Sequence, residues 1–452
     1  MAKDNTLKLT EGTIWKVLLI FVLPIIGGSL IQQLYTTVDA VIVGKFVGKT
    51  GLAAIDSVAT LFKFPINFLS GLSAGATIVI SSYFGSDDDD ELDCSIHTAY
   101  TIAIILGILC SVAGFLFAPQ LIRIMSVPED IQPITLAYCR VYFAGLWAMT
   151  LYNMVAGILR AFGNSRAPFY ILIACAITNI VGDLLLVGVF HLGVVGAATA
   201  TIASQLLSAL LAMQMLGKLH HHCHEHVWQI RICPEHMPKM LAIGFPLALQ
   251  SILFPIANSI VQASINTMGT DIIASWAVVN KLDLVIWLIA DSMGPALSTY
   301  TAQNIGAGRK DRLSQGAFIG AAMSFCTVGL ICILLYFTCG PLGSLFVTSA
   351  DAPTIVPMVV HYMKMMCPFY VFYTLAESFS GVCCGMGDTV KPMITTLLCT
   401  CGLRVLAIFF IMPLYNTMEC IVWIYVASWI VTGLAFVGMY LIKLRKLNRS
   451  GC

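Results

Sequence analysis

The chain has 452 residues, of which 58% are hydrophobic and only 10% are charged, and its formal net charge is +1. A soluble domain carries about 25% charged residues, so this composition excludes an ordinary soluble protein and indicates that lipid is the main solvent. The near-neutral charge also argues against a nucleic-acid partner.

The apolar runs are long and continuous, which predicts membrane-spanning helices rather than a closed barrel. Each span needs about 20 residues. We therefore expect an all-α membrane protein with twelve transmembrane helices. In chain order, these helices are predicted over residues 14–46, 50–83, 95–117, 131–161, 167–189, 193–217, 238–268, 272–303, 312–337, 353–385, 391–414 and 418–444.

The two halves of the sequence resemble each other at an offset of roughly 221 to 224 residues. The clearest match pairs residues 138–168 with residues 362–392. Duplicated halves are typical of transporters, and parallel repeats are related by an axis along the membrane normal. The sequence thus predicts two six-helix lobes related by a pseudo-two-fold along that normal. Their expected bounds are 1–217 for the N-terminal lobe, 218–237 for a cytoplasmic linker and 238–452 for the C-terminal lobe.

Lysine and arginine concentrate in one set of loops and tails, including Lys218, Arg231 and Arg309, whereas the opposite set holds Lys45, Lys49 and Arg123. The richer side is expected to be cytoplasmic, which places both termini in the cytoplasm. The first dozen residues are polar and show no signal peptide. These features predict an integral multi-pass protein of the cell (inner) membrane.

Two acids fall well inside predicted spans, where a charge is costly and usually marks a site. Asp39 lies in the first span, and Asp183 shares one helix face with Asn179 in the fifth. Thr201 follows in the next span, and Asn153 precedes in the fourth. Such carboxylate, amide and hydroxyl oxygens are suitable ligands for sodium, and two adjacent acids equally suit a shared proton. The choice between Na⁺ and H⁺ stays open.

Three other features of the spans carry separate expectations. Asp56 and Asp283 are expected near span ends or paired, with Lys281 as the neighbour of Asp283, and the role of Asp291 is left open. Pro24 removes a backbone hydrogen bond inside the first span and permits a kink. We predict that ion occupancy at Asp39 biases a bend at Pro24.

Six motifs in chain order resemble the multidrug and toxic compound extrusion (MATE) family. They are TTVDAVIVGKFVG, GLSAGATIVISSYFG, GILRAFGNSRAPF, NIVGDLLL followed by GVVGAATAT, STYTAQNIGAGRKDR and GVCCGMGDTVKP. The resemblance implies a cation-coupled antiporter that expels organic, often cationic and amphipathic, small molecules from a central cavity between two six-helix lobes. It also implies that Asp39, Asn179, Asp183 and Thr201 form the first-lobe cation site, with Asn153 facing it, and that Pro24 is the bending proline.

The second half departs from part of that pattern. Family members with a second-lobe acid in the seventh helix have it about where this chain has Phe254, and the acid of the tenth helix falls near Tyr373, one turn before Glu377. This favours coupling through the first lobe. Candidate substrate-cavity residues are Gln32, Gln33, Tyr35, Gln250, Asn258 and Glu377.

The remaining signals carry weaker expectations. The tract His220–His226 (HHHCHEH) could bind a transition metal but is expected to be a solvated linker, and the sixteen cysteines are expected to be small buried hydrophobes. Two alternatives stay open: a lipid-linked oligosaccharide flippase of the same architecture, and an intramembrane aspartyl protease suggested by the GxGD pattern ending at Asp388. We otherwise expect a monomer that is not an enzyme and has no cofactor besides its coupling ion.

Overall fold

The computed structural model describes residues 7–218 and 230–449, and this part of the chain is helical, with no strand. Eleven of its helices are long and apolar enough to cross a bilayer, and the count rises to twelve if the bent pair α9–α10 is taken as one span. The predicted all-α membrane fold with twelve spans is therefore confirmed.

The chain forms two compact units, each described here by itself. Among the described residues, the first comprises 7–9, 20–218, 230–248 and 306–308, and the second comprises 10–19, 249–305 and 309–449. Relative to the lobes expected from the sequence, the start of the first helix groups with the second unit, and the start of the eighth helix groups with the first.

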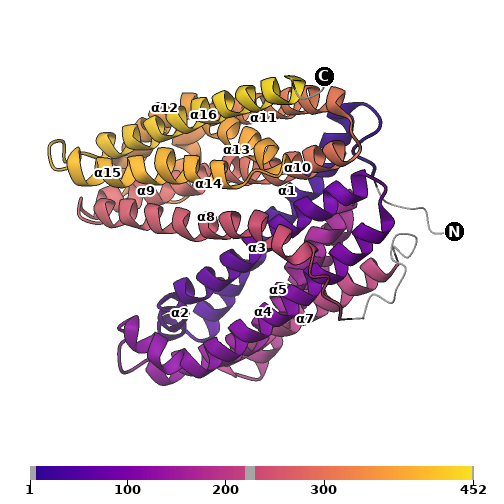
Figure 1. Cartoon of the computed structure of the whole chain (residues 1–452). Helices are drawn as coiled ribbons and strands as arrows, with labels where there is room; N and C mark the ends of the chain where they lie inside the picture. Colours follow the sequence, from indigo (N-terminus) through magenta and orange to yellow (C-terminus); the bar gives the residue numbers. More distant parts are fainter. Residues whose placement is uncertain (1–6, 219–229, 450–452) are drawn as a thin grey trace. The chain divides into compact units, whose positions relative to one another are not determined.

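The first half consists of the following helices, several of which pack around α5. They are α1 (Ile14–Phe46), α2 (Lys49–Asp56), α3 (Ala59–Gly85), α4 (Asp89–Ile124), α5 (Gln132–Ala161), α6 (Arg166–Asp183) with the π-helical segment η1 (Leu184–Val189), and α7 (Gly193–Gly217). Figure 1 shows α3, α4, α5 and α7 bundled together, and α5 contacts α3, α4, α6 and α7. Their apolar side chains form one buried core that includes Ile80, Tyr100, Val155 and Phe162.

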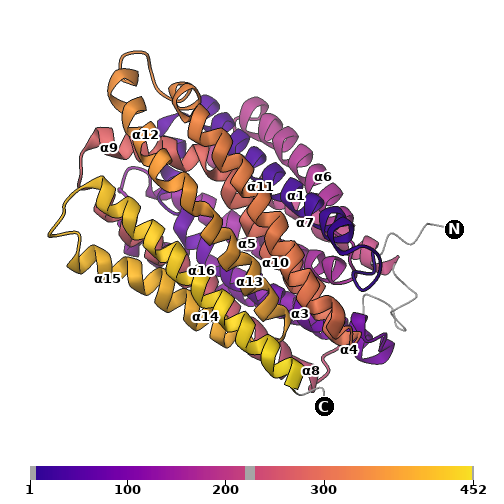
Figure 2. The ribbon, with the colours of Figure 1, turned by 90° about the horizontal axis from the view of Figure 1, so that it is seen from above.

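The second half begins with α8 (His236–Ile265), α9 (Thr270–Leu282), α10 (Leu284–Gly306) and α11 (Lys310–Ser344). It continues with α12 (Ala352–Met366), the short 3₁₀ segment η3 (Cys367–Phe369) and α13 (Tyr370–Gly385). The last elements are α14 (Val390–Thr395), the π-helical segment η4 (Thr396–Gly402), α15 (Leu403–Phe410) and α16 (Met418–Arg449). Figure 2 shows α14 and α15 running alongside α16, and α13 packs against both α11 and α16.

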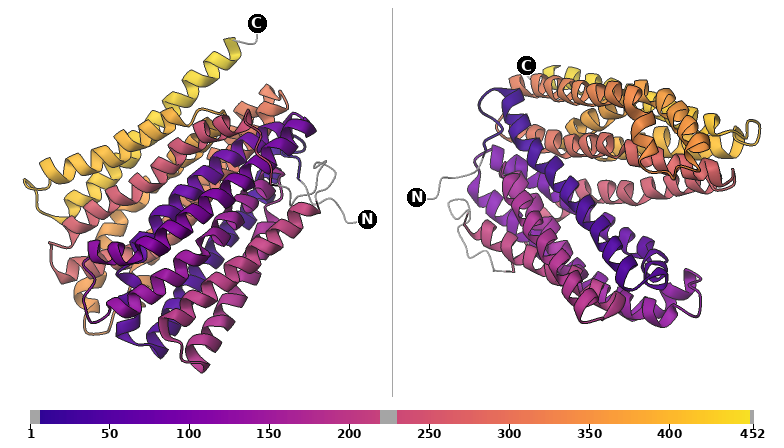
Figure 3. Two further views of the ribbon diagram at one scale, coloured as in Figure 1. Left: turned by 60° about the horizontal axis from the view of Figure 1, so that its bottom comes forward. Right: turned by 180° about the vertical axis from the view of Figure 1, so that it is seen from behind.

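Several of the predicted spans are interrupted. The second span is divided into α2 and α3, and the eighth bends by 49° between α9 and α10, where Asp283 caps α9. The tenth is broken at η3, where Pro368 has no N–H to donate to the preceding turn. The sequence did not predict these breaks within the spans expected over 50–83, 272–303 and 353–385, whereas α1 runs as one helix through Pro24 (Figure 3).

The internal repeat recurs in the geometry of one turn. Gly163 and Gly387 both adopt positive φ, at 74° and 81°, a conformation that glycine reaches without a steric penalty. The next residue caps the following helix in both halves: Asn164 Oδ1 accepts from Ala167 N at 3.0 Å, and Asp388 Oδ1 accepts from Lys391 N at 3.3 Å. The two halves therefore reverse direction by the same turn.

The cysteines follow the expectation in part. Cys175 and Cys332 are buried, as expected, but Cys326 is exposed. Cys94 at the start of α4 and Cys233, just before α8, form a disulfide across a sequence separation of 139 residues. The expectation that all cysteines act as small hydrophobes was wrong for this pair, because residues 230–235 run back along the first turns of α4.

Candidate cation and substrate site

Three helices of the first unit bring together four of the predicted site residues. Asp39 comes from α1, Asn179 and Asp183 from α6, and Thr201 from α7. The carboxyl groups of Asp39 and Asp183 lie close enough for their charges to influence each other, and Asn179 Nδ2 lies 3.5 Å from Thr201 Oγ1. Asn179 and Asp183 are almost completely buried, with 1% and 0% of their surface exposed.

An irregular helical turn adjoins Asp183. Asp183 is the last residue of α6, and the π-helical segment η1 begins immediately after it. A π turn widens the helix locally, and such turns are frequent at functional sites. The wider turn follows directly on the residue that carries the carboxylate.

The oxygen atoms of this cluster have few partners. Asp39 Oδ1, Asn179 Oδ1 and both carboxylate oxygens of Asp183 are buried and accept no hydrogen bond from any described residue. Carboxylate and amide oxygens can only accept hydrogen bonds, and buried acceptors without a partner are costly. A group of acceptors facing one another is stabilised by a proton or by a cation that takes oxygen ligands. The arrangement can therefore hold either.

Asn153, which was expected to face this cluster, lines the neighbouring cavity. It lies on α5, its backbone carbonyl accepts a hydrogen bond from Ser73 at 3.0 Å, and its side chain lines a separate cavity. Within residues 7–218, no hydrogen bond joins it to Asp39, Asn179 or Asp183. The structure thus assembles four of the five predicted cation-site residues and places the fifth in the neighbouring cavity.

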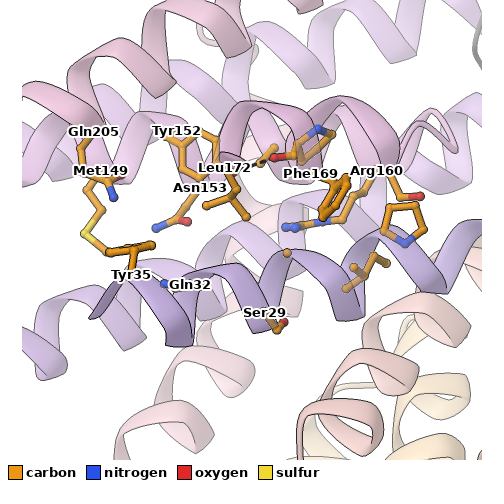
Figure 4. A pocket seen from close by; sticks show the side chains of 16 residues that line it. Ser29, Gln32, Tyr35, Met149, Tyr152, Asn153, Arg160, Phe169, Leu172 and Gln205 are labelled. Atoms are coloured by element: carbon orange, nitrogen blue, oxygen red, sulfur yellow. Dashed lines mark hydrogen bonds between the residues drawn. The ribbon is translucent and has the colours of Figure 1, made fainter. Parts of the chain in front are cut away.

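That cavity lies beside α1 and has a volume of about 110 Å³. Figure 4 shows Tyr35, Met149 and Gln205 at one end and Arg160 and Phe169 at the other. Three predicted residues, Gln32, Tyr35 and Pro24, also line it, and so do Asn153, Tyr152 and Leu172.

The contact between α1 and α6 closes one side of the cavity. A Cβ atom added to Gly27 would lie 2.8 Å from a ring carbon of Phe169, and one added to Gly28 would lie 3.1 Å from a methyl carbon of Leu172. These glycines therefore allow α1 to approach α6 closely within one turn of Pro24. Any bend at Pro24 would change this contact and the size of the cavity.

Sequence reasoning missed most residues of this cavity. Among them, Met149 and Arg160 lie on α5, and Gln205 lies on α7. Gln205 is 5% exposed, and its Oε1 atom accepts no hydrogen bond from the described residues. A signal was present for Gln205, because it is polar inside a span and lies four residues after Thr201, on the same helix face.

The other tentative cavity residues are not gathered in one place. Gln33 is exposed on α1. In the second unit, Gln250 donates to Thr396 at 3.3 Å, and Asn258 accepts from Arg404 at 2.8 Å. The carboxyl group of Glu377 lies near Tyr373 and Asp291.

Two acids of the second unit accept hydrogen bonds from tyrosine hydroxyls. Tyr373 donates to Asp291 at 2.7 Å, and Tyr370 donates to Asp283 at 2.7 Å. Lys281 was expected to pair with Asp283, but its ammonium group lies over the Phe346 ring. The expected ion pair between Lys281 and Asp283 was wrong. Lys281 lies in the last turn of α9, whereas Asp283 lies at the bend between α9 and α10, so their side chains point to different neighbours. Asp56 is exposed at the end of α2, as expected for an acid near a span end.

The two remaining motifs do not add a catalytic or metal centre to the described structure. Asp388 accepts hydrogen bonds from Lys391 at 2.9 Å and forms an ion pair with Lys443 at 3.1 Å. It is therefore held by cations in a turn, whereas an aspartyl protease needs two facing carboxyl groups. The tract His220–His226 lies outside the described residues.

Comparison with known proteins places the chain in a family. The model of the MatE family matches residues 24–185 and, a second time, residues 246–410. This chain belongs to the MATE family. The family model matches once in each half, starting at Pro24 and Pro246, so the MATE fold of this chain is duplicated as its sequence indicated.

Relatives and solved structures agree with this assignment. The chain is 28% identical to the "Probable multidrug resistance protein YoeA" of Bacillus subtilis, with 96% of this chain and 95% of the relative covered. It is 26% identical to the "FAD transporter" of Shewanella oneidensis, over 75% of this chain and 76% of the relative. A structure titled "Outward-facing conformation of a multidrug resistance MATE family transporter of the MOP superfamily" has a TM-score of 0.90 at 20% identity, covering 99% of this chain and 100% of the other. This last likeness concerns the fold.

Proposed function

We propose that this MATE-family chain is a sodium- or proton-coupled antiporter that exports organic compounds by alternating access. The observation that carries the proposal is the buried cluster of oxygen acceptors at Asp39, Asn179 and Asp183. Two interacting carboxyl groups in a medium of low dielectric constant repel each other unless a proton or a cation joins them. Asp39 and Asp183 are therefore assigned as the coupling residues, with Asn179 and Thr201 as further oxygen ligands.

The substrate is proposed to use the cavity beside α1. Its lining combines aromatic and apolar groups such as Tyr35, Met149 and Phe169 with the polar groups of Gln32 and Asn153, which suits amphipathic molecules. Sites for drug-sized ligands usually have volumes of about 300–1,000 Å³, so the observed 110 Å³ must expand before such a molecule fits. The names of two relatives, a multidrug resistance protein and an FAD transporter, support a test with both organic cations and flavins.

Coupling is proposed to act through α1, because this helix carries both Asp39 and Pro24. An ion bound between α1 and α6 favours the arrangement in which these helices touch. The same arrangement keeps the cavity small, since Gly27 and Gly28 pack on Phe169 and Leu172. Ion binding would thus displace the substrate. The ion shifts the equilibrium only by the difference between its affinities for the two states.

The remaining expectations belong to the same proposal. We propose that the protein is a monomer in the cell (inner) membrane. Both termini are proposed to lie in the cytoplasm, because basic residues concentrate on that side. The flippase alternative receives little support from the first-unit cavity. Among the described residues, Arg160 is the one basic side chain in its lining, whereas diphosphate groups would need several.

The test is transport in proteoliposomes under an imposed sodium gradient or an imposed pH gradient, with a fluorescent organic cation as substrate. The wild-type protein is expected to expel the cation under one of the two gradients. Asp39→Asn and Asp183→Asn should each abolish the response to that gradient. Asp56→Asn is the matched control, because this acid is exposed at the end of α2 and should leave transport unchanged. Gradient-driven export that survives in both site variants would refute the proposed site.

A further inference from the structure

A second cavity lies in the second unit, away from the residues assigned to coupling. It has a volume of about 360 Å³ and is bordered by α8, α9, α10, α12 and α16. Its wall includes the rings of Phe254, Trp276 and Tyr425 and the polar side chains of Asn258 and Asp283. The size falls within the range of small-molecule sites.

A buried arginine lies directly behind this wall. Arg404 is 1% exposed, and its Nε donates to Ser428 Oγ at 2.9 Å, while its Nη1 donates to Asn258 Oδ1 at 2.8 Å. The guanidinium carbon lies 4.2 Å from the ring centre of Tyr425 and 5.9 Å from that of Phe254. Three of the groups around it therefore also line the cavity.

The positive charge of Arg404 is not neutralised by its described neighbours. Nη2 is buried and has no hydrogen-bond partner among residues 7–218 and 230–449, and over the same residues no carboxylate lies within ion-pair distance of the guanidinium group. A guanidinium stays charged in proteins. Leaving a buried charge unpaired is strongly unfavourable, and inside a membrane such a residue usually marks a functional site.

Arg404 also fixes the direction of the Asn258 side chain. Arginine can only donate hydrogen bonds, so the amide oxygen of Asn258 must point toward it. The amide NH₂ group of Asn258 is then left to donate from the wall of the cavity. An entering anion would meet this donor first, with the positive charge immediately behind it.

One acid faces the same cavity and has the opposite effect. Asp283 accepts from Tyr370 at 2.7 Å, its second carboxylate oxygen is buried without a hydrogen-bond partner in the described chain, and the group is 2% exposed. Its negative charge opposes an anion in the cavity. Removing the positive charge near Asn258 and removing the negative charge of Asp283 should therefore have opposite effects on anion binding. Opposite effects distinguish a change in charge from general damage to the fold.

The internal repeat places Arg404 at a position that corresponds to the coupling site of the first unit. At the offset that pairs Asp183 with Ala407, Arg404 corresponds to Ile180, one residue after Asn179 and three before Asp183. The same span thus carries buried oxygen acceptors in the first unit and a buried cation in the second.

We propose that the second-unit cavity binds the anionic group, a carboxylate or phosphate, of an aromatic small molecule. Asn258 donates to the anion, Arg404 supplies the positive charge, and the rings of Trp276 and Tyr425 pack on the aromatic part. The proposal does not rest on the coupling site, because it concerns binding without an ion gradient.

The experiment compares two probes of the same shape, 2-naphthoate and its neutral amide 2-naphthamide, binding to the full chain in phosphatidylcholine nanodiscs. Charge-assisted hydrogen bonds predict that the wild-type protein prefers the carboxylate by about 10-fold or more. Asn258→Asp should abolish the preference while the fold is kept, because the new carboxylate pairs with Arg404. Asp283→Asn should increase it, and Arg404→Lys should preserve part of it.

Lys364→Gln is the matched control, since this lysine lies in the same unit, on α12, with its ammonium group over the Tyr336 ring. It should leave the preference unchanged. Nanodiscs that contain phosphatidylglycerol show where the bound anion comes from. If the lipid competes with naphthoate, the site is supported with a lipid headgroup as its occupant. If it does not compete, the site is supported with a soluble molecule as its occupant. Equal affinity for the two probes, or an unchanged preference in Asn258→Asp, would overturn the proposal.

Discussion

Asn179 donates a hydrogen bond from Nδ2 to Thr201 Oγ1 at 3.5 Å, and this contact joins α6 to α7 beside Asp183. The Thr201 hydroxyl uses its own hydrogen for the carbonyl oxygen of Ala197 at 3.0 Å. The hydroxyl oxygen therefore keeps one lone pair that a cation can use.

Thr201→Val should consequently distinguish the two coupling ions. Valine has the same shape but no oxygen, so sodium should bind roughly 10-fold more weakly, whereas proton coupling at the two carboxyl groups should change little. The measurement is the sodium dependence of transport in proteoliposomes.

Thr199→Val is the control for this substitution. Thr199 is exposed on the same helix, and its hydroxyl donates to the Val195 carbonyl at 2.7 Å. Equal losses of sodium dependence in the two variants would show that the Thr201 oxygen is not a ligand.

Gly381→Ala should destabilise the second unit. An added methyl group would overlap the carbonyl oxygen of Gly294 on α10, and overpacking of this kind costs about 1–3 kcal/mol. Gly438→Ala is the control, because nothing lies within 4 Å of its added Cβ, and alanine favours a helix by about 1 kcal/mol. Thermal unfolding in detergent should rank the proteins Gly438→Ala, wild type and Gly381→Ala in decreasing stability, and an unchanged Tm for Gly381→Ala would contradict the close contact.

Reduction of the Cys94–Cys233 disulfide should release the segment before α8. Residues 231–233 are held to α4 by the disulfide and by two hydrogen bonds, from Thr101 to the Arg231 carbonyl at 3.2 Å and from Cys233 N to Thr98 at 3.0 Å. Trypsin should therefore cleave after Arg231 faster in a Cys94→Ser variant or after treatment with a thiol reductant. Cys326→Ser, which changes an exposed free cysteine, is the control. Identical cleavage rates in oxidised and reduced protein would argue against the restraint.

The stability of the turn at Asp388 should depend on pH. Burial acts to raise the pKa of Asp388, but the hydrogen bonds from Lys391 and Lys443 outweigh it and hold the pKa below its ordinary value. The folded state then binds this proton less readily than the unfolded state, so the turn's contribution is fully present above about pH 4 and is lost as the pH falls through the folded pKa.

The comparison that checks this prediction is the Tm of the wild type and of Lys443→Met between pH 3 and pH 7. Lys443→Met should lower the Tm near neutral pH and converge with the wild type at the acid end. A difference that stays constant across the range would assign the effect to lost packing of the lysine stem.

Much of the fold could be predicted because lipid imposes strong constraints on a chain. The length of each apolar run identified the spans, and α1 was predicted to its terminal residues. The first-unit acids were identified for the same reason, since Asp183 stands in a run with little other polarity. The breaks at Asp283 and η3 and the π-helical segments could not be predicted, because they change backbone hydrogen bonding without changing hydrophobicity.

Long-range pairings were also beyond the sequence. Cys94 and Cys233 are 139 residues apart, and Asn258 and Arg404 are 146 residues apart. Neither pair has a local pattern that links its members, so only the packing of helices brings them together. The pairing of Arg404 with Asn258, and the lack of a neutralising carboxylate beside it among residues 7–218 and 230–449, likewise depend on helix packing.

The two π-helical segments determine which way later side chains point. An α-helix turns by about 100° per residue, and a π turn accommodates one extra residue in a turn. Side chains beyond η1 and η4 are therefore rotated relative to an uninterrupted helix. Arg404 follows η4 by two residues. A continuous α-helix with the same number of residues would turn this guanidinium by about 100°, away from Asn258 and Ser428, whereas deletion of one residue within Thr396–Gly402 would remove the π turn and keep Arg404 on its present face. Homologous sequences aligned without a gap here would then compare residues on different faces of the same helix.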